Sequence, residues 1–269
     1  MTDETNTILS WWGNFKLDHD QCRQWQIGPL SLLIRHLNGE WQVAYERLDN
    51  SDDQTASVEI NNTSQSPETL ENNSRYIFRK TKGLLTITPL LADRPVIARP
   101  HISFNLTAGE ETVLYVSTPL WLELAIGSSP MKVLESIAIQ RPSDTWFGPS
   151  TLEGELCYAT KTHCRLNLAD ISHRPHRAIT PVLVRNQADT TLAIERLNLP
   201  APLLPVFSAA NGQLWTPKIT LTRERDGDMA ELQIDKKPPK EAKQASLLSN
   251  PRSNSDSTIL IRAFNTVFS

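Results

Sequence analysis

The densest group of chemically capable side chains lies between residues 141 and 158. Its members, which combine charged and aromatic types among prolines and glycines, are Arg141, Asp144, Trp146, Phe147 and Tyr158. Loops that hold such side chains together frequently bind a partner, and Trp and Arg are enriched among the residues that dominate protein interfaces. A structural interpretation competes: Trp146 and Phe147 would close the end of a sandwich, while Arg141 and Asp144 form an ion pair.

A motif rich in histidine follows further along the chain. It supplies His173, Arg174 and His176. Cys157, His163 and Cys164 precede it, but a zinc site needs three or four converging ligands. On a strand, Cys164 would point away from the face that His163 occupies. We therefore expect no metal, and we assign the histidine motif to a protein-contact surface near the aromatic segment.

Two patterns resemble enzyme motifs. Gly148-Pro-Ser150-Thr-Leu152 begins like the nucleophile elbow of a serine hydrolase, but Leu152 stands where a second glycine is needed. Glu153 and Glu155 would share one strand face about 7 Å apart, a separation that resembles the carboxylate pair of glycoside hydrolases. A solvated strand face explains the same spacing. The glycine-rich motifs that bind phosphate are absent from the sequence, and we expect no cofactor.

Short antiparallel strands must position these side chains. Asn38-Gly39 and Asp226-Gly227 accept the positive φ angles of a type I′ turn. A two-residue turn at each place aligns apolar residues across the gap. The predicted pairs are Leu32–Tyr45, Ile34–Val43, His36–Trp41, Ile219–Ile234 and Leu221–Leu232. Because a slip of one residue would reverse every face, this agreement predicts an all-β chain built from two antiparallel, immunoglobulin-like β-sandwich domains with little helix.

Composition suggests how the chain is divided. We expect an N-terminal β-sandwich domain at 8–128, with a flexible acidic loop at 49–74, and a C-terminal β-sandwich domain at 129–235. Residues 236–257 combine Lys, Pro, Asn and Ser, a composition typical of a disordered linker. The apolar run at 258–269 is expected to be a terminal strand that returns to a sheet edge.

Bulk properties exclude several classes of partner. The chain has 269 residues, a net charge of −3 and a pI near 6.1, so it has no general attraction for nucleic acid. Three cysteines are a poor disulfide framework. The polar, acidic start does not resemble a signal peptide, and no apolar run approaches the roughly 20 residues that span a bilayer. We expect a cytoplasmic protein that does not insert into membranes directly.

Several phrases of the sequence together resemble a prokaryotic family of uncharacterised proteins, domain-of-unknown-function family four-three-two. They include Trp25-Gln-Ile-Gly-Pro-Leu30, Tyr115-Val-Ser-Thr-Pro-Leu-Trp121, Arg141-Pro-Ser-Asp-Thr-Trp-Phe-Gly-Pro149, Gly154-Glu-Leu-Cys-Tyr-Ala159 and His173-Arg-Pro-His-Arg177. The resemblance extends from Trp12 to the C-terminus and brings no known activity or site residue. Members of the family are often encoded beside small-conductance mechanosensitive channels, so the resemblance implies a partner of a membrane assembly, peripheral to the inner membrane.

Three functions follow as hypotheses. The first is a non-enzymatic cytoplasmic interaction protein, an accessory subunit of a larger assembly such as that channel. The second is a glycan hydrolase that uses carboxylates near 144–155. The third is a carbohydrate-binding module, which requires Trp11, Trp12 or Trp25 to be exposed as stacking platforms. The sequence leaves the oligomeric state open.

Overall fold

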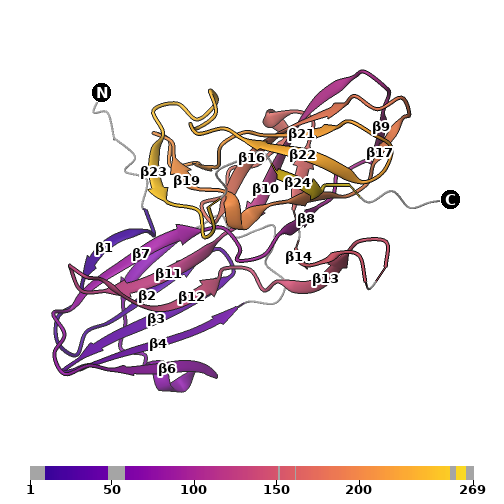
Figure 1. The fold of residues 1–269 in the computed structure, drawn as a ribbon. Coiled ribbons are helices and arrows are strands. Elements are labelled where there is room, and N and C mark those ends of the chain that lie inside the picture. The colour runs from indigo at the N-terminus through magenta and orange to yellow at the C-terminus, as the bar shows by residue number, and fades with distance from the viewer. Residues whose placement is uncertain (1–9, 48–57, 151, 161, 255–258, 265–269) are drawn as a thin grey trace, which may run out of the picture. The chain divides into compact units, whose positions relative to one another are not determined.

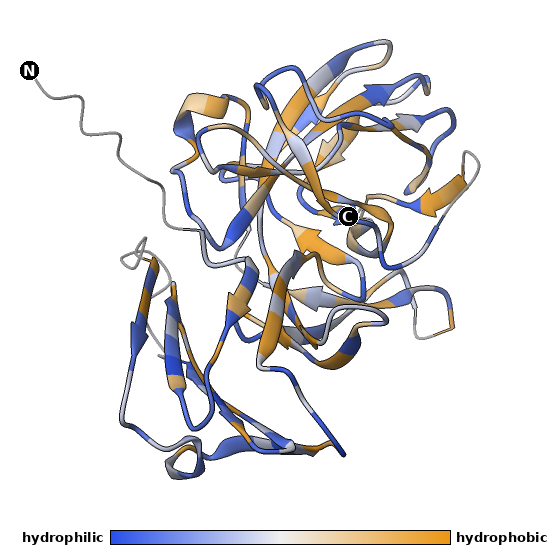
Figure 2. Ribbon diagram, turned by 90° about the vertical axis from the view of Figure 1, so that its left-hand side faces the viewer, coloured by the Kyte–Doolittle hydropathy of each residue, from blue (hydrophilic) through white to orange (hydrophobic). Residues whose placement is uncertain are grey.

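The computed structural model describes residues 10–47, 58–150, 152–160, 162–254 and 259–264. The described residues form strands β1 to β24 and three short 3₁₀ turns, without an α-helix (Figure 1). They also include no helix long and apolar enough to cross a membrane. Apolar and polar residues are interleaved along many strands (Figure 2), as expected when one face of a sheet is buried. The predicted all-β fold class is confirmed.

Contacts within the chain define two compact units. Unit 1 contains residues 1–89 and 121–140, and unit 2 contains residues 90–120 and 141–269. This grouping is discontinuous, unlike the single boundary at residue 128 expected from composition. That boundary remains a prediction, because compactness does not establish which segments fold independently.

Unit 1 contains two antiparallel sheets, with strand orders β5-β2-β3-β4-β6 and β1-β7-β11-β12. The strands are β1 (Gly13–Lys16), β2 (Cys22–Ile27), β3 (Leu30–Leu37), β4 (Glu40–Arg47), β5 (Val58–Asn62), β6 (Asn72–Ile77), β7 (Leu84–Leu90), β11 (Trp121–Ile126) and β12 (Lys132–Ala138). Phe15 and Trp25 meet edge to face across the two sheets, with ring centroids 5.3 Å apart. The sheets therefore pack face to face around an aromatic core.

The hairpin at Asn38-Gly39 has the predicted register. β3 and β4 pair Ile34 with Val43 and His36 with Trp41. Gly39 has a φ of +76°, and a Cβ atom there would lie 2.8 Å from the carbonyl oxygen of Phe78. Glycine is required at this turn by both its conformation and the neighbouring backbone.

Two of the three tryptophans considered as sugar platforms are inaccessible. Trp11 and Trp25 are fully buried, because large aromatic side chains fill the core of unit 1, so their predicted exposure is wrong. Trp12 is half-buried, and its ring lies at 89° to that of Trp11. A sugar-binding role for Trp12 stays a prediction.

The segment predicted as a flexible loop at 49–74 contains regular structure. Residues 48–57 lie outside the described residues, but β5 pairs with β2, and the 3₁₀ turn η1 (Pro67–Thr69) follows. Leu70 packs against the buried side chains of Cys22, Leu33 and Ala44 on the outer face of the sheet. The prediction of an unstructured segment was wrong here, because backbone pairing and the apolar side chains of Pro67 and Leu70 suffice to order a polar sequence.

A polar contact connects the edges of the two sheets of unit 1. The hydroxyl of Tyr76 on β6 lies 3.1 Å from Glu135 Oε2 on β12. The guanidinium of Arg47 donates two hydrogen bonds to the carbonyl of Ala138, at 2.9 and 2.7 Å. Burial raises the pKa of Glu135, although hydrogen bonds and the charge of Arg47 act in the opposite direction.

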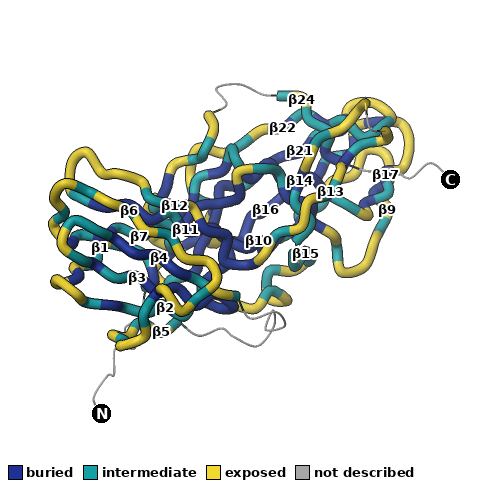
Figure 3. The backbone as a smooth tube through the Cα atoms, turned by 90° about the horizontal axis from the view of Figure 1, so that it is seen from below, coloured by how far each residue is buried: buried dark blue, intermediate teal, exposed yellow. Residues whose placement is uncertain are grey.

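Unit 2 contains a nine-stranded sheet, a four-stranded sheet and a two-stranded sheet. The nine-stranded sheet comprises β10 (Glu111–Pro119), β15 (His163–Arg165), β16 (Arg177–Asn186), β19 (Val206–Ser208), β20 (Leu214–Trp215), β21 (Ile219–Arg223), β22 (Met229–Ile234), β23 (Ser246–Ser249) and β24 (Ile259–Arg262). The four-stranded sheet has the order β13 (Ser143–Phe147), β14 (Glu155–Ala159), β8 (Val96–Ala98) and β18 (Leu197–Leu199), and β9 (Phe104–Leu106) pairs with β17 (Leu192–Ile194). Figure 3 shows that β16 is buried along most of its length, whereas many turns are exposed.

Pairing around β16 corrects the expectation of purely antiparallel sheets. β16 runs antiparallel to β10 but parallel to both β20 and β21. Its near-continuous burial suits this central, two-sided position. The hairpin at Asp226-Gly227 has the predicted register, with Leu221 opposite Leu232 and Ile219 opposite Ile234.

The segment predicted as a disordered linker at 236–257 also contains a strand. β23 pairs with β19, and Ala242 is buried in a cluster with Trp215; residues 255–258 lie outside the described residues. The prediction was wrong for 236–254, because pairing of the backbone does not require an apolar sequence. The final strand, expected to return to a sheet edge, is β24, which pairs with β22.

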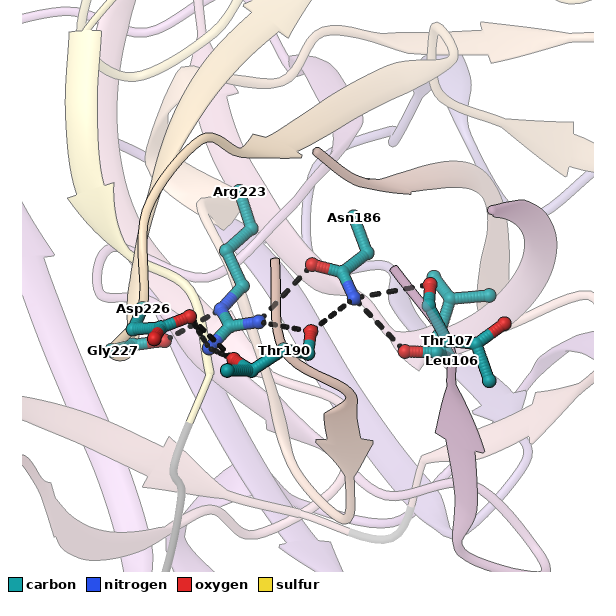
Figure 4. A network of polar contacts seen from close by, with 7 residues as sticks. All are labelled: Leu106, Thr107, Asn186, Thr190, Arg223, Asp226 and Gly227. Carbon is teal, nitrogen blue, oxygen red and sulfur yellow. Dashed lines mark hydrogen bonds and ion pairs between the residues drawn. The ribbon is translucent and has the colours of Figure 1, made fainter. Parts of the chain in front are cut away.

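A buried arginine connects the loops beside the β21–β22 hairpin. Arg223 is 3% exposed, and it donates to Asn186 Oδ1, to both oxygens of Thr190 and to the carbonyl of Gly227 (Figure 4). The amide of Asn186 donates to three further carbonyls, those of Leu106, Thr107 and Thr190. Because all these partners lie within unit 2, we interpret this network as structural.

Candidate functional site

The predicted aromatic segment forms an antiparallel hairpin at the edge of the four-stranded sheet. It consists of β13 (Ser143–Phe147) and β14 (Glu155–Ala159), and β14 continues the sheet to β8 (Val96–Ala98) and β18 (Leu197–Leu199). The register places Asp144 opposite Tyr158 and Trp146 opposite Leu156. Since side chains alternate along a strand, these four residues share one face of the hairpin.

The other face of the hairpin is part of the core. Phe147 and Cys157 are 1% and 0% exposed, and they pack together with Ile97 of β8. This removes Phe147 from the contact surface predicted for the segment. Cys157 belongs to this core, where burial raises the pKa of its thiol to about 12.

Trp146 is both exposed and held in place. Its side chain is 43% exposed, and its indole N–H donates a hydrogen bond of 2.7 Å to the carbonyl of Ser150. The ring lies against Gly154, where a Cβ atom would be only 2.7 Å from Nε1. Gly148 meets Gly154 from the other side of the loop, with a Cβ position 2.5 Å from Cα of Gly154. The loop therefore fixes the indole before any partner arrives.

A group of charged and polar side chains adjoins the tryptophan. Arg94 forms an ion pair of 3.1 Å with Asp144, and its guanidinium carbon lies 5.2 Å from the centroid of the Tyr158 ring. The hydroxyl of Tyr158 lies 3.0 Å from Asp93 Oδ1. Burial raises the pKa of Tyr158, and its hydrogen bond to Asp93 raises it further.

This group includes two residues that sequence reasoning missed. Asp93 and Arg94 precede β8, and they reach the hairpin only because β8 pairs with β14. No local sequence signal identifies them. The predicted ion pair between Arg141 and Asp144 is replaced by Arg94–Asp144, while Arg141 is exposed at the start of the hairpin.

The histidine motif belongs to another part of unit 2. It lies in the connection between η2 (Leu168–Asp170) and β16. His173 is exposed and Arg174 is half-buried, whereas His176 is 1% exposed. Partial desolvation by the surrounding chain lowers the pKa of His173, although the residue is exposed by accessible surface. His176 is therefore also removed from the predicted contact surface, because an accessible surface cannot include a fully buried side chain.

The residues considered for catalysis do not converge. Asp144 and Glu155 lie on opposite faces of the hairpin, as their registers require. Glu153 is exposed in the loop, and Glu155 accepts a hydrogen bond from the amide of Asn198. Ser150 Oγ accepts hydrogen bonds from the N–H groups of Leu152 and Glu153, so it stabilises a turn. Within the described ranges, no three His, Cys, Asp or Glu side chains are grouped to hold a metal ion.

The fold and this surface define an all-β protein with a rigid, aromatic hairpin at a sheet edge. The chain belongs to the family described as "Protein of unknown function (DUF432)", whose family model matches residues 11–269. A search of curated proteins found no match, and a search of solved structures also found none.

Proposed function

We propose that this chain is a non-enzymatic interaction protein that captures a protein partner through the exposed face of the β13–β14 hairpin. The observation that supports this proposal is the fixed, exposed indole of Trp146. Ordering side chains on binding costs free energy, and a side chain that is ordered beforehand avoids that cost. A preorganised tryptophan is therefore well suited to anchor an interface.

The surroundings of Trp146 support the same function. Leu156 is 43% exposed beside it, and Leu152 is 94% exposed in the loop of the hairpin. Arg94, Asp144 and Tyr158 form a polar margin next to these apolar side chains. An apolar centre with a polar margin is the usual anatomy of a protein interface.

The cellular setting is part of the proposal. The protein acts in the cytoplasm as an accessory subunit of a larger assembly, and the small-conductance mechanosensitive channel is the candidate that the family resemblance suggests. Such an assembly would place the protein beside the inner membrane through its partner. The glycan-hydrolase alternative receives no support from the positions of Asp144, Glu153 and Glu155.

The test is affinity purification of the full chain from detergent-solubilised host cells, followed by mass spectrometry. Truncation of an interface tryptophan typically costs about 2 kcal/mol or more, which corresponds to a roughly 30-fold loss of affinity. Trp146→Ala should therefore recover far less of each specific partner. Leu260→Ala is the matched control, because Leu260 is an exposed apolar side chain on β24 (68% exposed). Full recovery by a folded Trp146→Ala protein would refute the proposal.

A further inference from the structure

The outer edge of β13 is unpaired within the described part of the chain. β13 stands at the end of the order β13-β14-β8-β18, and Ser143, Asp144 and Trp146 on it are exposed. The backbone groups along such an edge are available to another strand. Pro142 and Pro149 flank the strand, which limits the open edge to about the five residues of β13.

β13 itself lacks three of the protections that edge strands commonly carry. Proteins commonly protect open edges with lysines, prolines or β-bulges. The strand sequence Ser-Asp-Thr-Trp-Phe contains no lysine or proline, and its pairing with β14 continues through all five residues without a register shift. The edge therefore has no bulge between Ser143 and Phe147, and a further strand can pair along these residues.

Charge and spacing indicate what that strand carries. Arg94 reaches Asp144 from the side of β8, across the ring of Tyr158, and the Asp144 side chain remains 65% exposed. Asp93 adds a second carboxylate to this group. The carboxylate of Asp144, which stays accessible in its ion pair with Arg94, can therefore accept a second basic partner beside the open edge.

We infer that the partner contributes an extended segment that pairs with the outer edge of β13, and that this segment carries a basic residue next to Asp144 and an apolar residue next to Trp146. Because Asp144 and Trp146 are two positions apart on one face, the basic and apolar residues must also be two positions apart. The inference rests on the proposed function and specifies the chemistry of the same surface.

A displayed library of random nine-residue peptides, selected on the full chain, tests this inference. The expected result is enrichment of peptides with Lys or Arg two positions from an aliphatic or aromatic residue. Their binding should weaken at least about tenfold with Trp146→Ala and with Asp144→Lys, while Leu260→Ala should leave it unchanged. Circular dichroism shows whether Trp146→Ala or Asp144→Lys alters folding. If one of them does, Leu156→Ser replaces it as a variant of the same exposed face.

Synthetic versions of the best peptide then test strand addition. In an added strand, alternate N–H groups point toward the edge and away from it. N-methylation of one alternating set should weaken binding about tenfold or more, while methylation of the other set should have little effect. Equal effects of the two sets would overturn edge pairing.

The remaining outcomes are distinct. Absence of enrichment, or enriched peptides whose binding ignores both Trp146→Ala and Asp144→Lys, would overturn the inference. Peptides that depend on Trp146 but lack basic residues would overturn the inferred charge while leaving the proposed function standing. The proposed function fails separately, when Trp146→Ala recovers every host partner.

Discussion

Replacement of Arg223 by alanine should destabilise unit 2 more than the loss of an ordinary surface arginine. The guanidinium donates five hydrogen bonds, with lengths of 3.0 to 3.3 Å, to Gly227, Asn186, Thr190 and Asp226. The acceptors come from the end of β16, the loop that follows it and the β21–β22 turn, so one side chain holds these segments together (Figure 4). After substitution, the buried Asn186 Oδ1 and the partly buried carbonyls of Thr190 and Gly227 would lose this donor.

The size of the effect follows from the exposure of each partner. The side chain of Asp226 is 63% exposed and that of Arg223 only 4%. Water can therefore replace Arg223 at the carboxylate of Asp226, and that ion pair contributes little. Asn186 Oδ1 is the buried acceptor of the network, whereas Thr190 lies at the surface and water can replace Arg223 there. We expect Arg223→Ala to cost about 1–3 kcal/mol, the cost of leaving one buried acceptor without its donor.

Urea unfolding, measured by circular dichroism, gives the global free energy. Hydrogen exchange measured by mass spectrometry locates the change, because peptides from residues 186–192 and 221–230 should lose protection first. Arg223→Lys should recover only part of the loss, since lysine keeps the charge but cannot form the same fork of hydrogen bonds. Arg225→Ala is the matched control in the same exposed turn, and it should change stability by less than about 0.5 kcal/mol.

The opposite result has a clear meaning. If Arg223→Ala costs less than about 1 kcal/mol, or if Arg225→Ala costs as much, the network does not hold these loops together. Exchange that is unchanged in both peptides would lead to the same conclusion.

Three further predictions concern other parts of the chain. Gly154→Ala should displace the Trp146 ring, because the new Cβ atom would lie 2.7 Å from Nε1. We expect a loss of about 1–3 kcal/mol in stability and weaker partner capture. Unchanged Trp146 fluorescence would contradict the displacement of the ring. Burial raises the pKa of Cys157 and of Cys164 to about 12, so a thiol reagent at pH 8 should label both only after unfolding; fast labelling of the native protein would refute it. Burial raises the pKa of Glu135 above its ordinary value of 4.5, so the folded state binds this proton more tightly and stability is lost as pH rises through the raised value. In urea titrations, the stability of Glu135→Gln relative to the parent protein should therefore increase between pH 4 and pH 8. A relative stability that decreases over this range would contradict the direction of the pKa shift.

The strand pairings that could be predicted are those set by local chemistry. Asn38-Gly39 and Asp226-Gly227 determine both turn and register, and the alternation of apolar residues confirms the choice independently. The strands inside polar stretches could not be predicted in this way. β5 (Val-Glu-Ile-Asn-Asn) and β23 (Ser-Leu-Leu-Ser) are short, have polar flanks and pair with strands that lie far away in sequence.

The candidate site, too, could be predicted only where local sequence determines the structure. Trp146 and Phe147 are adjacent on a strand, and alternation alone could have placed them on opposite faces. Asp93 and Arg94 are different, because their position beside Asp144 depends on the parallel pairing of β8 with β14. Nothing within the hairpin sequence specifies that pairing.

The opposite orientations of Trp146 and Phe147 explain how a small hairpin can be both rigid and available. Phe147 anchors β13 in the core with Ile97 and Cys157, so the strand cannot easily detach from its sheet. The same alternation then forces Trp146 outward, where the Ser150 carbonyl and the Gly154 backbone hold its ring. Trp146 is 43% exposed in this ordered position, and the proposed partner would contact that exposed part of the ring. The contacts that stabilise this sheet and the surface proposed for a partner are therefore two faces of one strand.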